Sequence, residues 1–511
     1  MLSKARSAYV IGIDAHPVEV EVDISARGLP HFSIVGLPDA SVKESKDRIR
    51  AALKNVGFAF PLKQITVNLA PADMKKEGSL FDLPIALGVA AAEGVIPPEP
   101  LLHYLIAGEL SLDGQVKPVR GALPLALAAK RLGLRGVILP KENAPEAAVV
   151  EGIDVFGIES IPAVISFLDG SDGRPAPVTI DLQAAMMQFG AYEEDFAEVK
   201  GQEHAKRALE VAAAGSHNIL MIGPPGSGKT MLARRLPSIL PPLTLEEALE
   251  TTKIHSVAGL LGEGQSLIAT RPYRSPHHTI SDIALIGGGQ IPRPGEVSLA
   301  HHGILFLDEL PEFKRNALEV LRQPLENGSV SVSRASASVA YPAQFVLVAA
   351  MNPCPCGYSG DSTHQCTCTP NMINRYRSRV SGPLLDRIDL HVDVPAVPYK
   401  ELSAEHACES SADIRERVIA ARERQLARFR NDRIYANGQM KTRHIKKYCV
   451  LTDEAHTLFD TAMHRLGLSA RAYSRILKVA RTIADLADAG TIEAGHIAEA
   501  IQYRSLDRKT A

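Results

Sequence analysis

The sequence has no excess of charge of one sign. Its 511 residues hold 56 Lys and Arg against 58 Asp and Glu, a formal net charge of −2. A protein that coats nucleic acid over its whole surface carries a strong positive excess, so this composition excludes that class. Any polyanion that the chain binds must be met by a local patch of positive charge.

Long hydrophobic runs are missing as well. No stretch reaches the roughly 18 to 20 uncharged apolar residues that a membrane-spanning helix needs. The first residues, MLSKARSAYVIGIDAHPVEVEV, turn acidic and alternating instead of forming the apolar core of an export signal. We therefore expect a cytoplasmic protein that has no membrane partner.

Cysteine is scarce, with six in the whole chain, too few for the disulfide framework of a secreted protein. Four of them form two Cys-x-Cys pairs that are nine residues apart. A structural zinc ion takes four soft ligands, although this pair spacing is tighter than the usual two to four residues. Disulfides or free buried thiols are the alternatives. The predicted zinc ligands are Cys354, Cys356, Cys366 and Cys368.

Local patterns divide the chain into four parts. Strand-like and helix-like segments alternate over residues 1–170, which predicts an α/β domain. Gly, Pro and Asp gather at 169–177, which indicates a linker over 171–197. Strand signals continue through a core at 198–396 and then stop, so 397–511 is expected to be helical. The expected elements are strands at 18–24 and 65–69, and helices at 82–92, 122–132, 412–430, 453–466 and 472–489.

Residues 223–230, GPPGSGKT, match the phosphate-loop pattern G-x-x-x-x-G-K-[ST]. An apolar segment precedes them and a helix-forming segment follows, which is the order that this motif requires. Such a loop turns backbone N–H groups into one concavity that holds phosphates. Lys229 is expected to reach the β- and γ-phosphates of ATP, and Thr230 to bind Mg²⁺. The predicted cofactor-binding residues of the loop are Gly223, Pro224, Pro225, Gly226, Ser227, Gly228, Lys229 and Thr230.

A second motif, GILFLDE at 303–309, is an apolar run that ends in two carboxylates. It predicts a buried strand whose carboxyl end faces the phosphates. Asp308 would complete the cofactor-binding set by holding Mg²⁺ through water, and Glu309 would polarise the attacking water. Asn352, at the end of another apolar run, could orient that water. Arg387 and Arg471 follow in order, and a surface ion pair is the alternative for an isolated arginine.

This ordered set resembles the ComM/YifB family, within the magnesium-chelatase-like branch of the AAA+ ATPases. The most specific strings are at 271–279, 287–289, 294–301 and 351–357. The resemblance implies that Asn352 is sensor 1, that Arg387 is a finger given to the neighbouring subunit's nucleotide, and that Arg471 is sensor 2, with Arg475 in reserve. It also implies a homo-oligomer of six subunits. The predicted catalytic residues are Lys229, Glu309, Asn352, Arg387 and Arg471.

Residues 108–119 and 133–143 resemble the Lon protease domain and the related C-terminal domain of the recombination protein RadA. Lon-type proteolysis needs a serine that a lysine activates. Alignment places Leu80 at the serine, with Ser79 one position away, and Leu123 at the lysine, so we expect no catalytic dyad. The expected fold class is therefore α/β, with a Lon-like (ribosomal-protein-S5-type) domain, an AAA+ P-loop module and a helical lid.

Two regions are candidates for DNA contact. The first is the central pore that the resemblance implies, where residues 326–341 would form one element, with Asn327-Gly328 as a hairpin turn signal. Arg293 and Arg334 are the candidate DNA contacts there, with exposed hairpin charges as the alternative. The second is residues 415–447, which hold eleven Lys and Arg against three Asp and Glu. Binding there would weaken steeply with salt, unless these residues are simply a solvated helix surface.

Two functions remain open. The resemblance implies an ATP-driven, ring-forming DNA motor, a helicase that promotes branch migration of single-stranded or branched recombination intermediates during natural transformation or recombination. The alternative is a magnesium-chelatase-like motor that remodels a partner protein. Phosphate-loop chemistry serves both. The Lon-like domain and the cysteine insertion at 354–368 favour the DNA motor.

Overall fold

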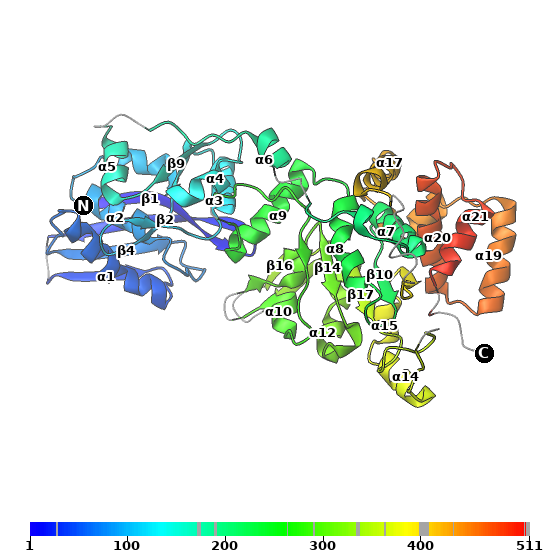
Figure 1. Ribbon diagram of the computed structural model, residues 1–511. Coiled ribbons are helices and arrows are strands. Elements are labelled where there is room, and N and C mark those ends of the chain that lie inside the picture. Colours follow the sequence, from blue (N-terminus) through cyan, green and yellow to red (C-terminus); the bar gives the residue numbers. More distant parts are fainter. Residues whose placement is uncertain are drawn as a thin grey trace. The chain divides into compact units, whose positions relative to one another are not determined.

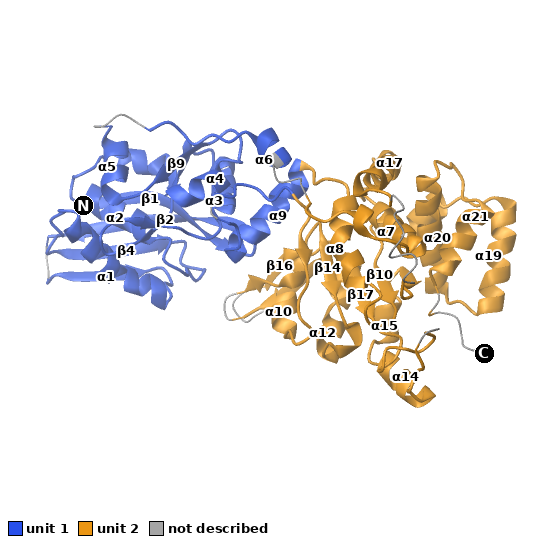
Figure 2. Ribbon diagram, in the orientation of Figure 1, with its two compact units in different colours: residues 1–189, 245–269 blue, residues 190–244, 270–511 orange. Residues whose placement is uncertain are grey.

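The computed structural model describes residues 1–26, 29–170, 175–188, 192–262, 264–289, 292–333, 338–361, 364–397, 408–432, 434–504 and 506. The chain forms two compact units (Figure 2). Unit 1 is Met1–Phe189 with Leu245–Ala269, and unit 2 is Gly190–Thr244 with Thr270–Ala511. Over the described ranges, every helix is too short or too polar to cross a membrane.

Unit 1 is built on a seven-stranded sheet of order β3-β4-β2-β1-β5-β8-β9 (Figure 1). Antiparallel pairing joins β1 to β2 and β2 to β4, and parallel pairing joins β1, β5, β8 and β9. Alternate residues of β2 are buried, as expected of a strand with one face on a core. The expected elements are confirmed: β2, β4, α2 and α3 coincide with the predicted strands and helices. The elements are β1 (Leu2–Ile11), β2 (Asp14–Ser25), β3 (His31–Val35), α1 (Ala40–Asn55), β4 (Gln64–Ala70), α2 (Asp82–Ala92), η1 (Glu99–Leu102), β5 (Tyr104–Ile106), β6 (Glu109–Leu110), β7 (Val116–Lys117), α3 (Ala122–Arg131), β8 (Gly136–Pro140), η2 (Lys141–Asn143), α4 (Ala144–Ala147), β9 (Asp154–Ile158), α5 (Ile161–Asp169) and α6 (Leu182–Gln188).

Helix α9 (Leu245–Ala258) packs in unit 1, although it lies between phosphate-loop residues and the second motif in the sequence. Lys253 Nζ lies 3.5 Å from a carboxylate oxygen of Asp14. The side chain of Ser256 lies near the carboxylate of Glu146, and Arg120 approaches Gly259. The chain therefore passes between the two units three times.

Unit 2 contains a five-stranded sheet of order β11-β14-β17-β10-β18, in which every pairing is parallel. All residues of β10, β14 and β17 are buried, as in sheets that are covered on both faces. The carboxyl ends of these strands share one edge, with β17 between β10 and β14. The elements before the helical end are η3 (Phe196–Glu198), α7 (Glu203–Gly215), β10 (Ile219–Ile222), α8 (Lys229–Ile239), β11 (Tyr273–Arg274), α10 (Asp282–Ile286), β12 (Gly287–Gly288), β13 (Arg293–Pro294), α11 (Glu296–Leu299), β14 (Ile304–Leu307), η4 (Leu310–Glu312), α12 (Arg315–Val320), α13 (Arg322–Asn327), β15 (Ser329–Ser333), β16 (Ser338–Pro342), β17 (Val346–Met351), α14 (Pro370–Arg377), α15 (Gly382–Leu385) and β18 (Leu390–Asp393).

The C-terminal part of unit 2 is helical, as expected. Its residues share one hydrophobic core with the sheet, in which Ile476 and Tyr503 join Ile219 and Phe306. Domain boundaries at 170, 197 and 396 stay predictions. The elements are α17 (Ser411–Arg428), η5 (Asn437–Gln439), α18 (Thr442–Tyr448), α19 (Asp453–Leu466), α20 (Ala470–Leu486) and α21 (Ala494–Gln502).

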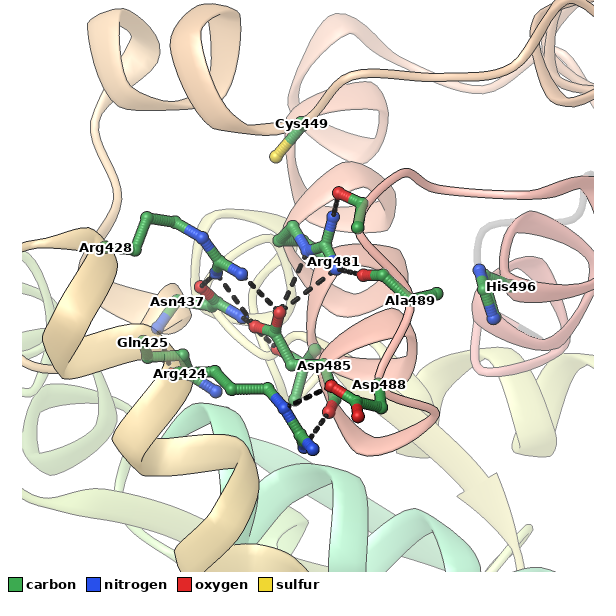
Figure 3. A network of polar contacts seen from close by, with 12 residues as sticks. Arg424, Gln425, Arg428, Asn437, Cys449, Arg481, Asp485, Asp488, Ala489 and His496 are labelled. Carbon is green, nitrogen blue, oxygen red and sulfur yellow. Dashed lines mark hydrogen bonds and ion pairs between the residues drawn. The ribbon is translucent and has the colours of Figure 1, made fainter.

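A buried polar network joins α17, η5 and α20 (Figure 3). The carboxylate of Asp485 accepts hydrogen bonds from Arg428, Arg481 and Asn437. Arg481 and Asp485 are each 1% exposed. Because polar groups in such a core are costly unless they are satisfied, the network holds these three elements in one arrangement.

Candidate active site

The phosphate loop connects buried strand β10 to helix α8. Gly223 admits no side chain, because a Cβ there would lie 2.0 Å from the backbone oxygen of Val394. Gly226 and Gly228 have φ values of +76° and +85°, a region that side-chain-bearing residues rarely adopt. Pro225 and Gly226 are exposed at the tip of the loop. Close packing therefore explains the glycine at 223, and the backbone conformation explains those at 226 and 228.

Lys229 is the first residue of α8, and its side chain binds the backbone of the phosphate loop. Its Nζ donates to the backbone oxygens of Gly223 and Pro224, each at 2.8 Å. Burial lowers the pKa of Lys229, while the carboxylates of Asp308 and Glu309 act in the opposite direction. An anionic phosphate beside this amine would favour its charged form.

The end of β14 lies beside the start of α8. The Thr230 hydroxyl donates to Asp308 Oδ2 at 2.7 Å, so the two predicted magnesium ligands are in direct contact. The next residue, Glu309, has a φ of +53° and a side chain that is 58% exposed. Its carboxylate is therefore accessible to water. The roles expected of the two carboxylates stay predictions.

Asn352, just beyond β17, approaches the same lysine. Its Oδ1 lies 3.4 Å from Lys229 Nζ. The hydroxyl of Tyr376 lies near the backbone of Asn352, and Arg377 Nε donates to the backbone oxygen of Pro353 at 3.2 Å. Residues of α14 therefore support the position of Asn352. The structure thus brings together Lys229, Thr230, Asp308 and Asn352 at one edge of the sheet.

The predicted arginines form ion pairs with residues other than these four. Arg387 pairs with Glu326 of α13 and donates to the Pro383 backbone oxygen, and its side chain is 9% exposed. Arg471 Nη1 donates to Asp386 Oδ2 at 2.7 Å. The roles of finger and sensor 2 stay predictions. A finger is expected to be apart from its own subunit's phosphates, because it acts on the neighbouring subunit.

Two neighbours of the site were missed by the sequence analysis. The side-chain amide of Gln202 donates to the backbone oxygen of Ser227 in the phosphate loop. His278 Nδ1 lies 3.6 Å from Glu309 Oε2, and its ring contacts that of Phe313. No spacing rule connects Gln202 to the phosphate loop or His278 to Glu309, because only the fold brings these residues together.

The four predicted zinc ligands form a cluster. All four sulfur atoms lie within 4.8 Å of one another. The Sγ atoms of Cys354, Cys356 and Cys366 are separated by 3.3, 3.6 and 3.8 Å. A tetrahedral zinc ion with bonds of about 2.3 Å places its sulfur ligands about 3.8 Å apart. All six cysteines are free thiols in the structure, so disulfides are not the arrangement shown.

The hairpin expected within 326–341 exists, but its predicted turn at Asn327-Gly328 is wrong. Gly328 caps α13 in the left-handed region with φ +66°, and Ser329 at the start of β15 pairs with Pro342 at the end of β16. The helix continues to Asn327, so Asn327 and Gly328 end α13 and do not form the turn between β15 and β16. Arg334 lies outside the described residues. Arg293 is exposed in β13, where it pairs with Gly288 of the neighbouring strand.

Several arginines of the basic segment at 415–447 are paired within unit 2, so its net charge overstates the charge available to DNA. Arg417 pairs with Glu210 and Glu409, and Arg422 donates to backbone oxygens at the end of α7. Arg424 pairs with Asp488 and Arg428 with Asp485. Exposed basic residues do remain in the segment. They are Arg430, Lys441, Arg443, Lys446 and Lys447.

The Lon-like positions of unit 1 carry no visible serine–lysine dyad. The Ser79 hydroxyl donates to the Glu109 carboxylate. The closest lysine in sequence, Lys76, is fully buried and donates to the backbone oxygens of Pro71 and Met74. Leu123 is fully buried as well. A serine bound to a carboxylate is not activated as a nucleophile by a lysine, and the absence of the dyad stays a prediction.

The site at the carboxyl edge of the unit 2 sheet indicates the class of protein to which the chain belongs. A phosphate loop follows β10, an acidic pair follows β14, and an asparagine follows the strand between them. The sequence matches the description "Magnesium chelatase, subunit ChlI" over residues 195–402, "Subunit ChlI of Mg-chelatase" over 20–143, and "Magnesium chelatase, subunit ChlI C-terminal" over 408–504. The chain is a magnesium-chelatase-like AAA+ protein.

Relatives that match over nearly the full length identify the family within this class. The protein YifB of Salmonella typhimurium is 48% identical over 98% of this chain and 96% of its own. The competence protein ComM of Haemophilus influenzae is 46% identical over the same shares. Lon protease 2 of Bacillus subtilis is 26% identical over 29% of either chain. The chain belongs to the ComM/YifB family.

Proposed function

We propose that this protein is an ATP-driven motor that acts on DNA as a ring of identical subunits and promotes branch migration of recombination intermediates. The observation that carries the motor is the convergence of Lys229, Thr230, Asp308 and Asn352 at one edge of the unit 2 sheet. The choice of DNA is supported by the relationship to a protein named for competence.

Each residue of the site would have its own role in ATP hydrolysis. The phosphate loop and Lys229 would bind the β- and γ-phosphates, where Lys229 offsets developing negative charge. Thr230 and Asp308 would hold Mg²⁺, which neutralises phosphate charge when it is bound. Glu309, with its exposed carboxylate, would take a proton from the attacking water, and Asn352 would orient that water. Arg387 of one subunit would act on the nucleotide of the next.

Exposed positive charge supports DNA contact at two places. Arg293 is exposed in the β12–β13 hairpin, and the basic residues between 430 and 447 that face solvent form a second group. The alternative, a motor that remodels a partner protein, is favoured by the match of 195–402 to a magnesium-chelatase subunit and by the internal pairing of Arg417, Arg422, Arg424 and Arg428.

DNA-dependent ATP turnover separates these alternatives. We expect single-stranded or forked DNA to raise the ATPase rate severalfold at low salt, with a stimulation that falls steeply as salt increases. The measurement is phosphate release with single-stranded, forked and duplex DNA, and the Glu309→Gln chain supplies the background. A flat response to every DNA form at low salt would exclude the DNA motor. Resolution of a strand-exchange intermediate only with hydrolysable ATP would support branch migration in particular.

We also propose that the four-cysteine cluster holds one structural zinc ion, which stabilises the wall of the nucleotide site. The separations of three sulfur atoms, 3.3 to 3.8 Å, are compatible with a closed tetrahedral site, which supports this proposal. Gly357, within the cluster's loop, is packed so closely that a Cβ would lie 2.6 Å from Pro225 of the phosphate loop. Asn352 and Pro353 precede the first cysteine directly. An ion that fixes this loop would therefore fix the approach to both Pro225 and Asn352.

Zinc content tests this proposal independently of activity. We expect about one zinc per chain in the purified protein, and loss of most of it in Cys366→Ser, because a closed site needs all four ligands. The ATPase rate of this variant should fall as the Asn352 loop loosens. Cys408→Ser, which changes a cysteine outside the cluster, is the matched control in elemental analysis. Equal zinc content in the two variants would contradict the assignment.

A further inference from the structure

The segment 386–389, which connects α15 to β18, is held by three ion pairs. Arg387 pairs with Glu326, while Asp386 and Asp389 pair with Arg471 and Arg475 of helix α20. The two α20 pairs differ strongly in burial. The side chains of Asp386 and Arg471 are 34% and 67% exposed, whereas those of Asp389 and Arg475 are 2% and 24% exposed.

Asp389 has further partners at the start of strand β10. Its Oδ2 accepts a hydrogen bond from the backbone N of Asn218 at 3.1 Å and lies 3.5 Å from His217 Nδ1. Burial opposes ionisation of Asp389, but the charge of Arg475 and the contact with His217 hold its pKa well below the ordinary range. Asp389 is therefore a charged group whose neighbours fix its position.

Asn218 extends these contacts to the backbone of Arg387. Its side-chain amide donates to the Arg387 backbone oxygen at 3.0 Å and accepts from the backbone N of Leu347 at 2.9 Å. His217 Nε2 lies 2.8 Å from the hydroxyl of Thr482 in α20, which also accepts from Asn437. A continuous set of buried contacts thus connects α20, β10, β17 and the backbone of Arg387. It continues through Asn437 to Asp485 in the network of Figure 3.

We propose that Asp389 is a positioning residue that sets Arg387 for the neighbouring subunit's nucleotide, by joining helix α20 through Arg475 to the start of β10. The inference rests on the proposed function, because it takes Arg387 to act in trans. Removing one partner of a buried ion pair leaves an uncompensated charge in the core, whereas an exposed pair such as Arg471–Asp386 opens readily. Arg475 is then a fixed attachment of the lid, and Arg471 is the arginine that can leave its partner for a nucleotide.

Rings assembled from two variant chains test the positioning role of Asp389 separately from the nucleotide site. An Arg387→Ala chain keeps its own site but lacks the finger, and a Lys229→Ala chain supplies the finger but has no working site. Mixing the two should restore ATP turnover. When Asp389→Asn is added to the Lys229→Ala chain, we expect the restored rate to fall at least tenfold. The matched control is Asp488→Asn in the same chain, which removes an exposed lid ion pair with Arg424 and should leave the restored rate unchanged.

Full restoration by the Lys229→Ala, Asp389→Asn chain would overturn the proposal. Thermal melting and ring size establish that this chain folds and assembles. Should it fail to fold, Arg475→Lys and Arg475→Gln replace it: the lysine variant, which keeps the charge beside Asp389, should retain most of the restoration and the glutamine variant should lose it. Equal restoration by the two variants would overturn the proposal as well.

A failed parental mixture would count against the finger in trans, not against Asp389. In that case Asp389→Asn is measured in an otherwise unchanged chain. We expect kcat to fall at least tenfold while the Kd for ATP stays within threefold, because the nucleotide contacts are intact and Arg387 is misplaced. An unchanged kcat, or a loss confined to ATP binding, would overturn the positioning role.

Discussion

Replacing Glu309 by glutamine is expected to lower kcat for ATP by about 10²- to 10⁴-fold, the usual contribution of a general base. Glutamine keeps the size of the side chain and removes only its ability to accept a proton. ATP binding should be retained, because the contacts that Lys229 makes with Gly223 and Pro224 of the phosphate loop do not involve Glu309. Single-turnover hydrolysis and nucleotide titration measure the two quantities separately.

The matched control for this variant lies three residues further on. Glu312 pairs with Arg379 at 2.7 Å and is 43% exposed, so Glu312→Gln makes the same chemical change next to the site. Its turnover should stay near that of the parent chain. Near-normal turnover of Glu309→Gln would mean that another group accepts the proton. His278, 3.6 Å from the Glu309 carboxylate, would then be the first residue to replace.

Replacing Lys229 by alanine should weaken ATP binding by about 2–5 kcal/mol, a factor of roughly 30 to 4,000, because the phosphates lose a buried charged partner. The side chain is only 8% exposed, so water cannot substitute fully for the missing amine. The backbone oxygens of Gly223 and Pro224 also lose their donor, which should loosen the loop. Fluorescent-nucleotide titration measures the affinity.

An exposed lysine of the same unit is the control for this change. Lys314 precedes α12 and is exposed, so Lys314→Ala removes a positive charge without touching the phosphate loop. Its affinity for ATP should be unchanged. An affinity of Lys229→Ala within threefold of the parent chain would contradict the role of Lys229, whatever happens to turnover.

Local sequence patterns predicted the helices and strands well where the apolar pattern of the segment itself determines its structure. Alternating apolar residues placed β2 and β4, and continuous apolar runs placed β10, β14 and β17 with their polar ends. Because parallel strands share an edge, the same reasoning brought Lys229, Asp308 and Asn352 together. The cysteine spacing predicted a cluster for a related reason, since both pairs lie in one short loop.

Long-range packing determined what the patterns could not show. The arginines at 417, 422, 424 and 428 look like surface charge in sequence, yet each finds an acceptor elsewhere in unit 2. The pair Asn327-Gly328 is typical of a hairpin turn, but Gly328 instead ends helix α13 as its left-handed C-terminal cap. The position of α9 in unit 1 likewise depends on partners such as Asp14 and Glu146, far from it in the chain.

Helix α9 also affects how the protein can be divided. Because the chain enters unit 1 again at 245–269, shortening it from the N-terminus does not release unit 2 as a clean fragment. A fragment that starts at residue 190 would still carry α9, now without the carboxylates of Asp14 and Glu146 that Lys253 and Ser256 contact. Producing the ATPase unit alone would require a short artificial loop that joins residues 244 and 270.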